Sequence, residues 1–495
     1  MNARVADSAE AIETWIFGWI CLVNNNKEPR KNDIGHKKLL APRKSLLWYS
    51  NGSIRFQLMK RGMDLLYASI GKAIEITRGQ ETAIESSSSA NEESSLWTYV
   101  VASLAASYYN VVGPSAKSAS SVANYSSSVL TNAWGVVSLP AVKKASLEAV
   151  RILKGAAIAD RIEICGVSCF VLSREPCPAL ASALRRYRRQ QKREDQRLGT
   201  IHESMLSTHS STANVSSFQK QNVILHLTGG GFFAHTIAGD LPYLLDWSAA
   251  CKAVIIIPEY ALLPQTFPDA ITEVANIYQS LRSGNSATLL GFATDNIVVS
   301  GESVGGNLAT ALCVSLITNH EEGGLSSYEI VNDLEEGDGG IPSSEYVSES
   351  RYRLDLPDAL LLSCPFLNMS LDYSSPSRVD GASDPVLPTA LISTISRSYC
   401  KASVEDPLAS PYFASDDILR NFPQTLIFTS SEDPLLDDSV AFNGRLRSVG
   451  VKSRLRAVPD MPHAYWGLST AGVPEARQVL KECQQWLAKV FNVST

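Results

Sequence analysis

Gly301-Glu302-Ser303-Val304-Gly305-Gly306 is the most informative segment of this chain, because it contains the pattern Gly-x-Ser-x-Gly. The residues before it, 296–300, form a β-branched apolar run that is typical of a buried strand. The residues after it, 307–314, have the composition of a helix. A strand that turns directly into a helix through Gly-x-Ser-x-Gly leaves little room for Cβ atoms and exposes the serine hydroxyl at the edge of a sheet. We therefore predict a strained turn at Ser303, with a chance occurrence of the pattern as the alternative.

The composition of the whole chain is that of an ordinary globular protein. Of its 495 residues, 45% are hydrophobic and 19% are charged, and the net charge of −6 gives no reason to expect a nucleic-acid partner. The nine cysteines are scattered without paired spacing, which favours a reducing, intracellular and cytoplasmic location over a disulfide framework. Cys165 and Cys169 lie near each other, but no second cysteine pair accompanies them, so we predict no metal site.

Apolar strands alternate with helical patterns through most of the chain. Near-continuous apolar strands separated by helices predict an α/β fold with a mostly parallel sheet covered by helices on both faces. The strand-like segments are 161–172, 223–227, 253–257, 297–300, 359–363, 425–429 and 453–458. The helical patterns include 269–282 and 474–491.

Residues 1–145 differ from the rest and predict a mainly helical N-terminal region. Residues 27–61 are basic, which fits either solvated charges on a cap or a surface that docks on anionic lipid. Residues 94–116 carry no charge and are long enough to span a bilayer. Their content of Ser, Thr and Asn favours a buried or interfacial helix instead.

Residues 146–495 are predicted to form the catalytic domain, with two segments that interrupt its rhythm. Residues 179–220 are polar and basic, and we interpret them as an exposed helix followed by a linker. Residues 320–350 are acidic, contain several glycines and predict a long surface insertion.

A serine nucleophile needs a base, and His463 is the candidate. It follows the predicted strand 453–458 and precedes the last helix. A loop at the carboxyl end of a strand is where parallel sheets place their functional groups. The other histidines precede Ser303 or, for His320, lie in the acidic insertion.

The acid that would orient this base is Asp433, directly after the predicted strand 425–429. Asp437 and Asp438 are competitors, although their position favours the first turn of the next helix. Glu432 is a weaker competitor. The order serine, aspartate, histidine along the chain is the order of an α/β hydrolase.

The remaining requirement is a set of N–H donors for an oxyanion. Residues 228–233, Thr-Gly-Gly-Gly-Phe-Phe, follow the predicted strand 223–227. Successive glycines allow backbone N–H groups to converge on a negative charge, so we predict Gly230, Gly231 and Val304 as the donors. A flexible turn or a phosphate loop are the alternatives, and the absence of a Gly-Lys-Ser/Thr ending argues against the second.

Together these motifs resemble the hormone-sensitive lipase family of α/β hydrolases. Residues 228–232 resemble its His-Gly-Gly-Gly-Phe motif, and 260–270 are similar to its Tyr-x-Leu-Ala-Pro-Glu-x-x-Phe-Pro stretch. Residues 301–306 resemble its Gly-Asp-Ser-Ala-Gly-Gly elbow, and 433–435 and 462–463 match its acid and base motifs. The resemblance implies that Ser303, Asp433 and His463 form a catalytic triad, and that the N-terminal residues supply a cap over the pocket.

The sequence departs from the family at two positions beside the site. Thr228 stands in place of the first histidine of the oxyanion motif, which implies a differently supported loop. Glu302 stands in place of aspartate next to the nucleophile. The stretch 384–388, Asp-Pro-Val-Leu-Pro, is closer to the animal-type enzyme than to short bacterial esterases.

The function that the resemblance implies is carboxylic ester hydrolysis through an acyl-enzyme, without a cofactor. A small-molecule ester or a lipid is the expected substrate, and the N-terminal region is a candidate for peripheral contact with a membrane or lipid droplet. An amidase, a deacetylase or an acyltransferase would use the same triad. A non-catalytic ligand-binding protein on this fold is the alternative from a different class.

Overall fold

The computed structural model describes residues 154–198, 218–321, 356–371, 375–384, 386–401, 404–469 and 473–493, with single positions between 143 and 151. The predicted N-terminal region lies outside the described residues apart from Lys143 and Lys144. The acidic insertion lies outside them from residue 322 onward. The cap, the lipid-docking surface and the boundary near residue 145 therefore stay predictions.

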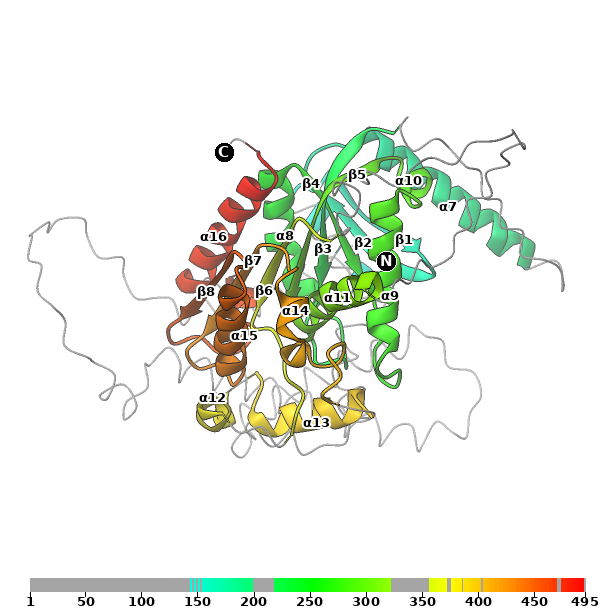
Figure 1. Cartoon of the computed structure of the whole chain (residues 1–495). Coiled ribbons are helices and arrows are strands. Elements are labelled where there is room, and N and C mark those ends of the chain that lie inside the picture. Colours follow the sequence, from blue (N-terminus) through cyan, green and yellow to red (C-terminus); the bar gives the residue numbers. More distant parts are fainter. Residues whose placement is uncertain are drawn as a thin grey trace, which may run out of the picture.

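A single eight-stranded sheet organises the described part of the chain, and Figure 1 shows it at the centre of the molecule. Its order is β1-β2-β4-β3-β5-β6-β7-β8, antiparallel from β1 to β4 and parallel from β4 to β8. The strands are β1 (Ile158–Ile164), β2 (Val167–Ser173), β3 (Lys220–Leu227), β4 (Ala253–Pro258), β5 (Ala293–Glu302), β6 (Ala359–Ser363), β7 (Thr425–Ser430) and β8 (Ser453–Val458).

Helices cover both faces of this sheet, as predicted (Figure 1). One face packs against α7 (Pro178–Leu198), α9 (Asp269–Ser283), α10 (Ala287–Leu290), α11 (Val304–Glu321) and α15 (Leu436–Ser448). Residues of α13 (Thr389–Tyr399), which lies below the sheet in Figure 1, join the same buried cluster. The other face packs against α8 (Ile237–Cys251), η5 (Tyr465–Ser469) and α16 (Pro474–Val490). The remaining short helices are α12 (Pro376–Asp380), η3 (Gly381–Ser383), η4 (Pro411–Phe413) and α14 (Asp416–Leu419).

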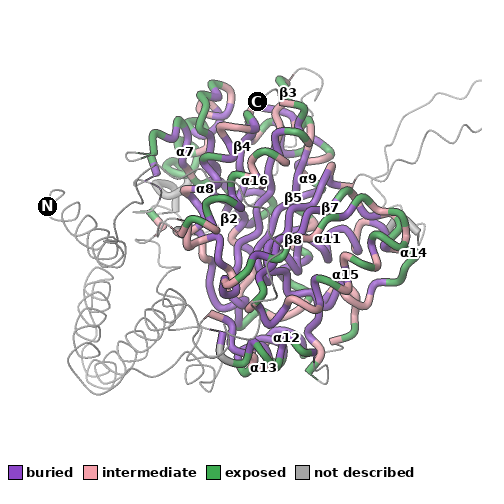
Figure 2. The backbone as a smooth tube through the Cα atoms, turned by 90° about the vertical axis from the view of Figure 1, so that its left-hand side faces the viewer, coloured by how far each residue is buried: buried purple, intermediate pink, exposed green. Residues whose placement is uncertain are grey.

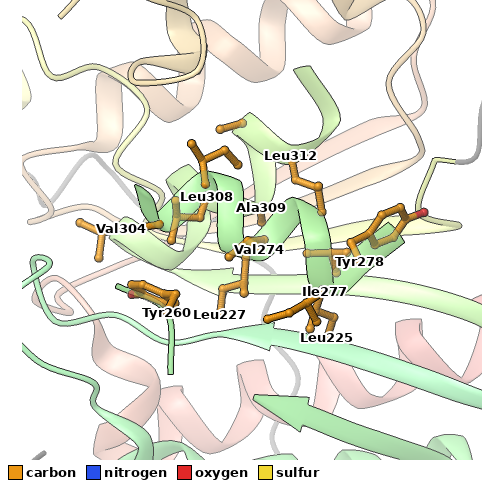
Figure 3. Packing of buried hydrophobic residues seen from close by; sticks show 14 of the residues in the cluster. Leu225, Leu227, Tyr260, Val274, Ile277, Tyr278, Val304, Leu308, Ala309 and Leu312 are labelled. Carbon is orange, nitrogen blue, oxygen red and sulfur yellow. The ribbon is translucent and has the colours of Figure 1, made fainter. Parts of the chain in front are cut away.

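The alternation of side chains along each strand explains the two faces. In β3, Val223, Leu225 and Leu227 contribute to one buried cluster, whereas Ile224 contributes to the other. Figure 3 shows Leu225 and Leu227 beneath the apolar residues of α9 and α11. Figure 2 shows the consequence, since buried residues follow the strands and exposed residues lie on the outer helices and loops. A strand buried on both faces reads as a continuous apolar run, which is why the sequence predicted these strands well.

The strand-like segment 161–172 forms the first two strands of the sheet, β1 and β2. β1 and β2 pair antiparallel through a turn at Cys165 and Gly166, which both have positive φ angles of 52° and 79°. A two-residue turn with both φ angles positive matches the right-handed twist of the flanking strands. The sheet therefore begins with a hairpin.

The basic stretch from residue 179 forms α7 as far as Leu198, and Lys220 already belongs to β3. Leu180, Ala183 and Leu184 are buried, so the beginning of this helix is part of the core rather than exposed as predicted. Their helical spacing places them on one side, while the arginines from Arg185 to Arg193 are exposed. Among the residues described, no helix is both long enough and apolar enough to cross a membrane.

Candidate active site

The predicted nucleophile stands at a strained turn between β5 and α11. Ser303 has a φ angle of 55°, in the left-handed region that residues with a side chain rarely adopt. Its N–H donates to Ser363 O at 2.9 Å, and its carbonyl accepts from Phe366 N at 3.0 Å. A Cβ on Gly305 would overlap the backbone oxygen of Leu227, so the helix can approach β3 only because this position is glycine.

The predicted base reaches this serine from the loop after β8. His463 Nε2 lies 2.8 Å from Ser303 Oγ, although 160 positions separate the two residues in the chain. Both side chains are buried. The parallel strands β5 and β8 end at the same edge of the sheet, which is how the fold brings them together.

The predicted acid holds the other side of the imidazole. Asp433 Oδ1 lies 3.0 Å from His463 Nδ1 and accepts from the N–H of Leu435 at 2.9 Å. Its Oδ2 accepts from Thr429 Oγ1 at 3.4 Å, and the thiol of Cys364 donates to the same carboxylate. The structure therefore brings Ser303, His463 and Asp433 into one hydrogen-bonded line.

The electrostatics of this line favour a charged acid and a basic imidazole. Burial alone raises the pKa of Asp433, but the charge of His463 and the hydrogen bonds to the carboxylate outweigh it and hold the pKa below its usual range. Burial alone lowers the pKa of His463, but the charge and hydrogen bond of Asp433 outweigh it and raise the pKa. The pair thus stabilises an imidazolium beside the serine.

The glycine loop after β3 lies beside the nucleophile. A Cβ added at Gly229 would be 3.5 Å from the Cβ of Ser303. Gly230 has a φ angle of 118°, and a Cβ there would overlap the carbonyl of Ala234. The loop conformation therefore requires glycine at Gly230. The donor roles of Gly230, Gly231 and Val304, the first residue of α11, stay predictions.

The two departures from the family motif are both buried. Thr228 Oγ1 lies 3.3 Å from His235 Nδ1, and Tyr260 donates its hydroxyl to Thr228 O at 2.6 Å. These contacts support the glycine loop without the family's histidine. Glu302 accepts from Ser363 Oγ at 3.4 Å, and burial, reinforced by the charge of Asp240, raises its pKa to about 8.

The competing acids have other partners. Asp437 and Asp438 stand in the first turn of α15, which confirms the position predicted for them. Asp437 Oδ2 accepts from the N–H of Ser377 at 2.8 Å, and Asp438 pairs with the buried Arg378 at 3.1 Å. These hydrogen bonds and ion pairs of Asp437 and Asp438 do not involve the imidazole of His463.

Sequence reasoning missed two residues that contact the acid and the base. Cys364 follows β6 and bonds to Asp433, and Asp384 accepts from the N–H of His463 at 3.0 Å. Asp384 belongs to the Asp-Pro-Val-Leu-Pro stretch, whose likeness to the animal-type enzyme was the one available signal. Nothing in the sequence around Cys364 distinguishes it from an ordinary core cysteine.

Among the described residues, one cluster has the side chains of a metal site: Cys364, Asp433 and His463, whose ligand atoms lie within 4.8 Å of one another. The imidazole has no nitrogen to spare for an ion, because Nδ1 faces Asp433 and Nε2 faces Ser303. The cluster is therefore better explained as the environment of the acid and base.

Comparison with known proteins agrees with this geometry. A family described as the alpha/beta hydrolase fold matches residues 224–467. An esterase from Acinetobacter venetianus is 25% identical over 267 residues, covering 53% of this chain and 74% of that protein. Human hormone-sensitive lipase is 27% identical over 189 residues, covering 38% of this chain and 14% of the lipase. The chain has the α/β-hydrolase fold and is similar to proteins of the hormone-sensitive lipase group.

Solved structures share the fold of this α/β hydrolase. A Pyrobaculum calidifontis esterase superposes with a TM-score of 0.51 at 17% identity, covering 74% of this chain and 94% of the esterase. The sequence relatives, which include several esterases, support carboxylic ester hydrolysis as the chemistry of this α/β hydrolase.

Proposed function

We propose that this α/β hydrolase cleaves carboxylic esters with apolar acyl groups through an acyl-enzyme formed on Ser303. The observation that carries the proposal is the hydrogen-bonded line from Ser303 Oγ to His463 Nε2 at 2.8 Å and from His463 Nδ1 to Asp433 Oδ1 at 3.0 Å. A serine is a weak nucleophile until an adjacent base removes its proton, and this line supplies that base and the acid that orients it.

In the proposed reaction, Ser303 Oγ attacks the ester carbonyl as its proton passes to His463 Nε2. The N–H groups of Gly230, Gly231 and Val304 stabilise the negative charge on the tetrahedral oxygen. The alcohol then leaves with the proton from His463, and the acyl group stays on Ser303. Water deprotonated by His463 attacks this acyl-enzyme, and the carboxylic acid leaves as Ser303 recovers its proton.

The preference for apolar acyl groups rests on the side chains beside the glycine loop. A Cβ added at Gly231 would lie 3.2 Å from Ile395 Cδ1 and from Phe233 Cδ2. Ile395 belongs to the buried side of α13, and Tyr399 at the end of this helix stacks on Phe232 with ring centres 3.5 Å apart. Apolar side chains therefore adjoin the place where the reacting carbonyl would bind.

The test is hydrolysis of p-nitrophenyl esters from acetate to octanoate by the wild type, Ser303→Ala and His463→Ala. We expect each variant to lose at least about 10³-fold in kcat, because the triad acts as a unit. For the wild type we expect kcat/KM to rise with acyl length over the first additions, since burial of each CH₂ contributes about 0.8 kcal/mol.

Ser448→Ala is the matched control, because Ser448 is exposed at the end of α15. It should keep the activity of the wild type. Wild-type turnover in Ser303→Ala or His463→Ala would contradict the triad. A kcat/KM that falls from acetate onward would contradict the apolar acyl preference and leave the triad intact.

A further inference from the structure

One segment contacts both the loop that carries the acid Asp433 and the loop that carries the base His463. It consists of α12, η3 and Asp384, and Figure 1 places α12 and the neighbouring α13 at the lower edge of the molecule, below α15. Ser377 of α12 donates its hydroxyl to Pro434 O at 3.0 Å, directly beside the acid Asp433. The segment is therefore tied to the acid loop at one end.

Its other end is tied to the base. Asp384 Oδ2 accepts from the backbone N–H of His463 at 3.0 Å. Asp384 Oδ1 accepts from the N–H of Val386 at 2.8 Å and of Leu387 at 2.6 Å. Asp384 is only 3% exposed, so three N–H donors hold both oxygens of a buried carboxylate. A carboxylate fixed in this way can in turn fix the backbone that bonds to it.

We propose that Asp384 is a positioning residue that holds the backbone of His463 so that the imidazole spans Ser303 and Asp433. The inference rests on the proposed function in one respect, which is that His463 acts as the base. Asp433 orients the ring, whereas Asp384 orients the peptide unit from which the ring extends. The base is thus held by two buried carboxylates that come from different parts of the chain.

The charge of Asp384 gives this role a measurable signature. Burial raises the pKa of Asp384 to about 6 against the opposing charge of His463, so the carboxylate is largely ionised above that pH. An ionised carboxylate near an imidazole favours the imidazolium and raises its pKa. Other titratable groups also act on this region. The charges of Asp433 and Glu302 act on His463, and the charge of Asp240 acts on Glu302. Cys364 is hydrogen-bonded to Asp433.

Asp384→Asn is the decisive variant. The amide has nearly the shape of the carboxylate, but one of its ends is an NH₂ group that repels the N–H it faces. We expect kcat to fall on the order of 10-fold with little change in KM, because the base is displaced while the substrate site is kept. We also expect the acid limb of kcat/KM to move to lower pH, because the lost charge lowers the pKa of His463.

Asp380→Asn is the matched control, since Asp380 is exposed on α12 four residues away. It should leave kcat and the acid limb unchanged. Asp384→Glu separates charge from position, because it keeps the carboxylate and moves it by one CH₂. For this variant we expect a lower kcat with the acid limb closer to that of the wild type.

A second measurement does not depend on turnover. The pKa of His463 is read by NMR from histidines labelled at Cε1, with the signal assigned from its loss in His463→Gln. We expect a lower pKa in Asp384→Asn than in the wild type and in Asp380→Asn. A chain without esterase activity would refute the proposed function, and this titration would still decide the role of Asp384.

Two results would overturn the proposal. One is a folded Asp384→Asn variant with the kcat and His463 pKa of the wild type. The other is a loss of kcat in Asp384→Asn with an unmoved acid limb and an unmoved His463 pKa, which would indicate general structural damage. If Asp384→Asn does not fold, Asp384→Glu decides, and a wild-type kcat there would refute a positioning role.

Discussion

Ser303 and His463 face each other across 2.8 Å, yet the structure holds them in place by different means. Ser303 is held by the backbone, because glycines let α11 begin against β3 and leave the serine at a φ angle of 55°. His463 is held by polar side chains from elsewhere in the chain, namely Asp433 and Asp384. The steric requirement at the elbow is marked by a local run of glycines, whereas the carboxylates that hold the base lie far from it in the sequence.

A substitution at Gly305 tests how the backbone holds Ser303, and we expect it to have the largest effect on activity. Gly305→Ala would drive a Cβ into the backbone of Leu227 and Thr228, neither of which can move without shifting β3. We expect a loss of about 2 kcal/mol or more of unfolding free energy, and a fall in kcat/KM on the order of 10² or more. Thermal unfolding and p-nitrophenyl butyrate hydrolysis measure the two effects.

Gly444→Ala is the control for Gly305→Ala. Gly444 is exposed in α15, and an added Cβ there would meet nothing within 4 Å. Because alanine is the better helix former, we expect this variant to gain up to about 1 kcal/mol and to keep its activity. Equal behaviour of the two variants would show that the close approach at Gly305 does not hold the elbow.

The same contrast explains what the sequence predicted. The glycine pattern at 301–306 and the apolar runs of the parallel strands are local signals, and both led to the observed strands and turn. The burial of the first turns of α7 was not predicted, because the many arginines of this segment outweighed Leu180 and Leu184 in the sequence pattern. The contacts of Asp384 and Cys364 with the base and acid could not be predicted, because each bridges at least 69 positions of chain and depends on the assembled sheet.

Substitutions at Cys364 test how the acid Asp433 is held, and we expect a smaller effect on activity than at Gly305. The thiol donates to Asp433, and its sulfur accepts from the N–H of Ala464 next to the base. Cys364→Ala removes both hydrogen bonds, and we expect kcat/KM to fall about 10-fold or somewhat more, the lower end of what a hydrogen bond to a charged group contributes. Cys364→Ser keeps a donor and an acceptor, and it should retain most of the activity.

The control for Cys364 is the same pair of substitutions at Cys313, a buried cysteine of α11. Both Cys313 variants should keep the wild-type kcat/KM, so that a general effect of a smaller core residue is separated from the hydrogen bond. Equal losses in Cys364→Ala and Cys364→Ser would show that the volume of the thiol matters rather than its bonds.

The smallest effect that we expect is on stability and concerns Glu302. This residue directly precedes Ser303 in the elbow and also carries a buried carboxyl group. It ends β5 beside the elbow, but burial and the charge of Asp240 raise its pKa from 4.5 to about 8. A carboxyl whose pKa is higher in the folded state than in the unfolded state contributes stability that is complete below the unfolded value. That contribution is lost as the pH rises through the folded value. Wild-type stability should therefore decline from about pH 4.5 to pH 8 on account of this group.

Glu302→Gln removes this titration and keeps the size of the side chain. We expect its melting temperature to exceed that of the wild type at pH 8 to 9 by the equivalent of about 1 kcal/mol, which is on the order of 2 °C. At pH 4 the two proteins should melt together, because Glu302 is then mostly protonated in both the folded and the unfolded state. Glu163→Gln is the control, since Glu163 is exposed on β1 and should show no such divergence. If the difference in melting temperature between Glu302→Gln and the wild type were the same at both pH values, the titration of Glu302 would not affect stability, and only the packing of its side chain would matter.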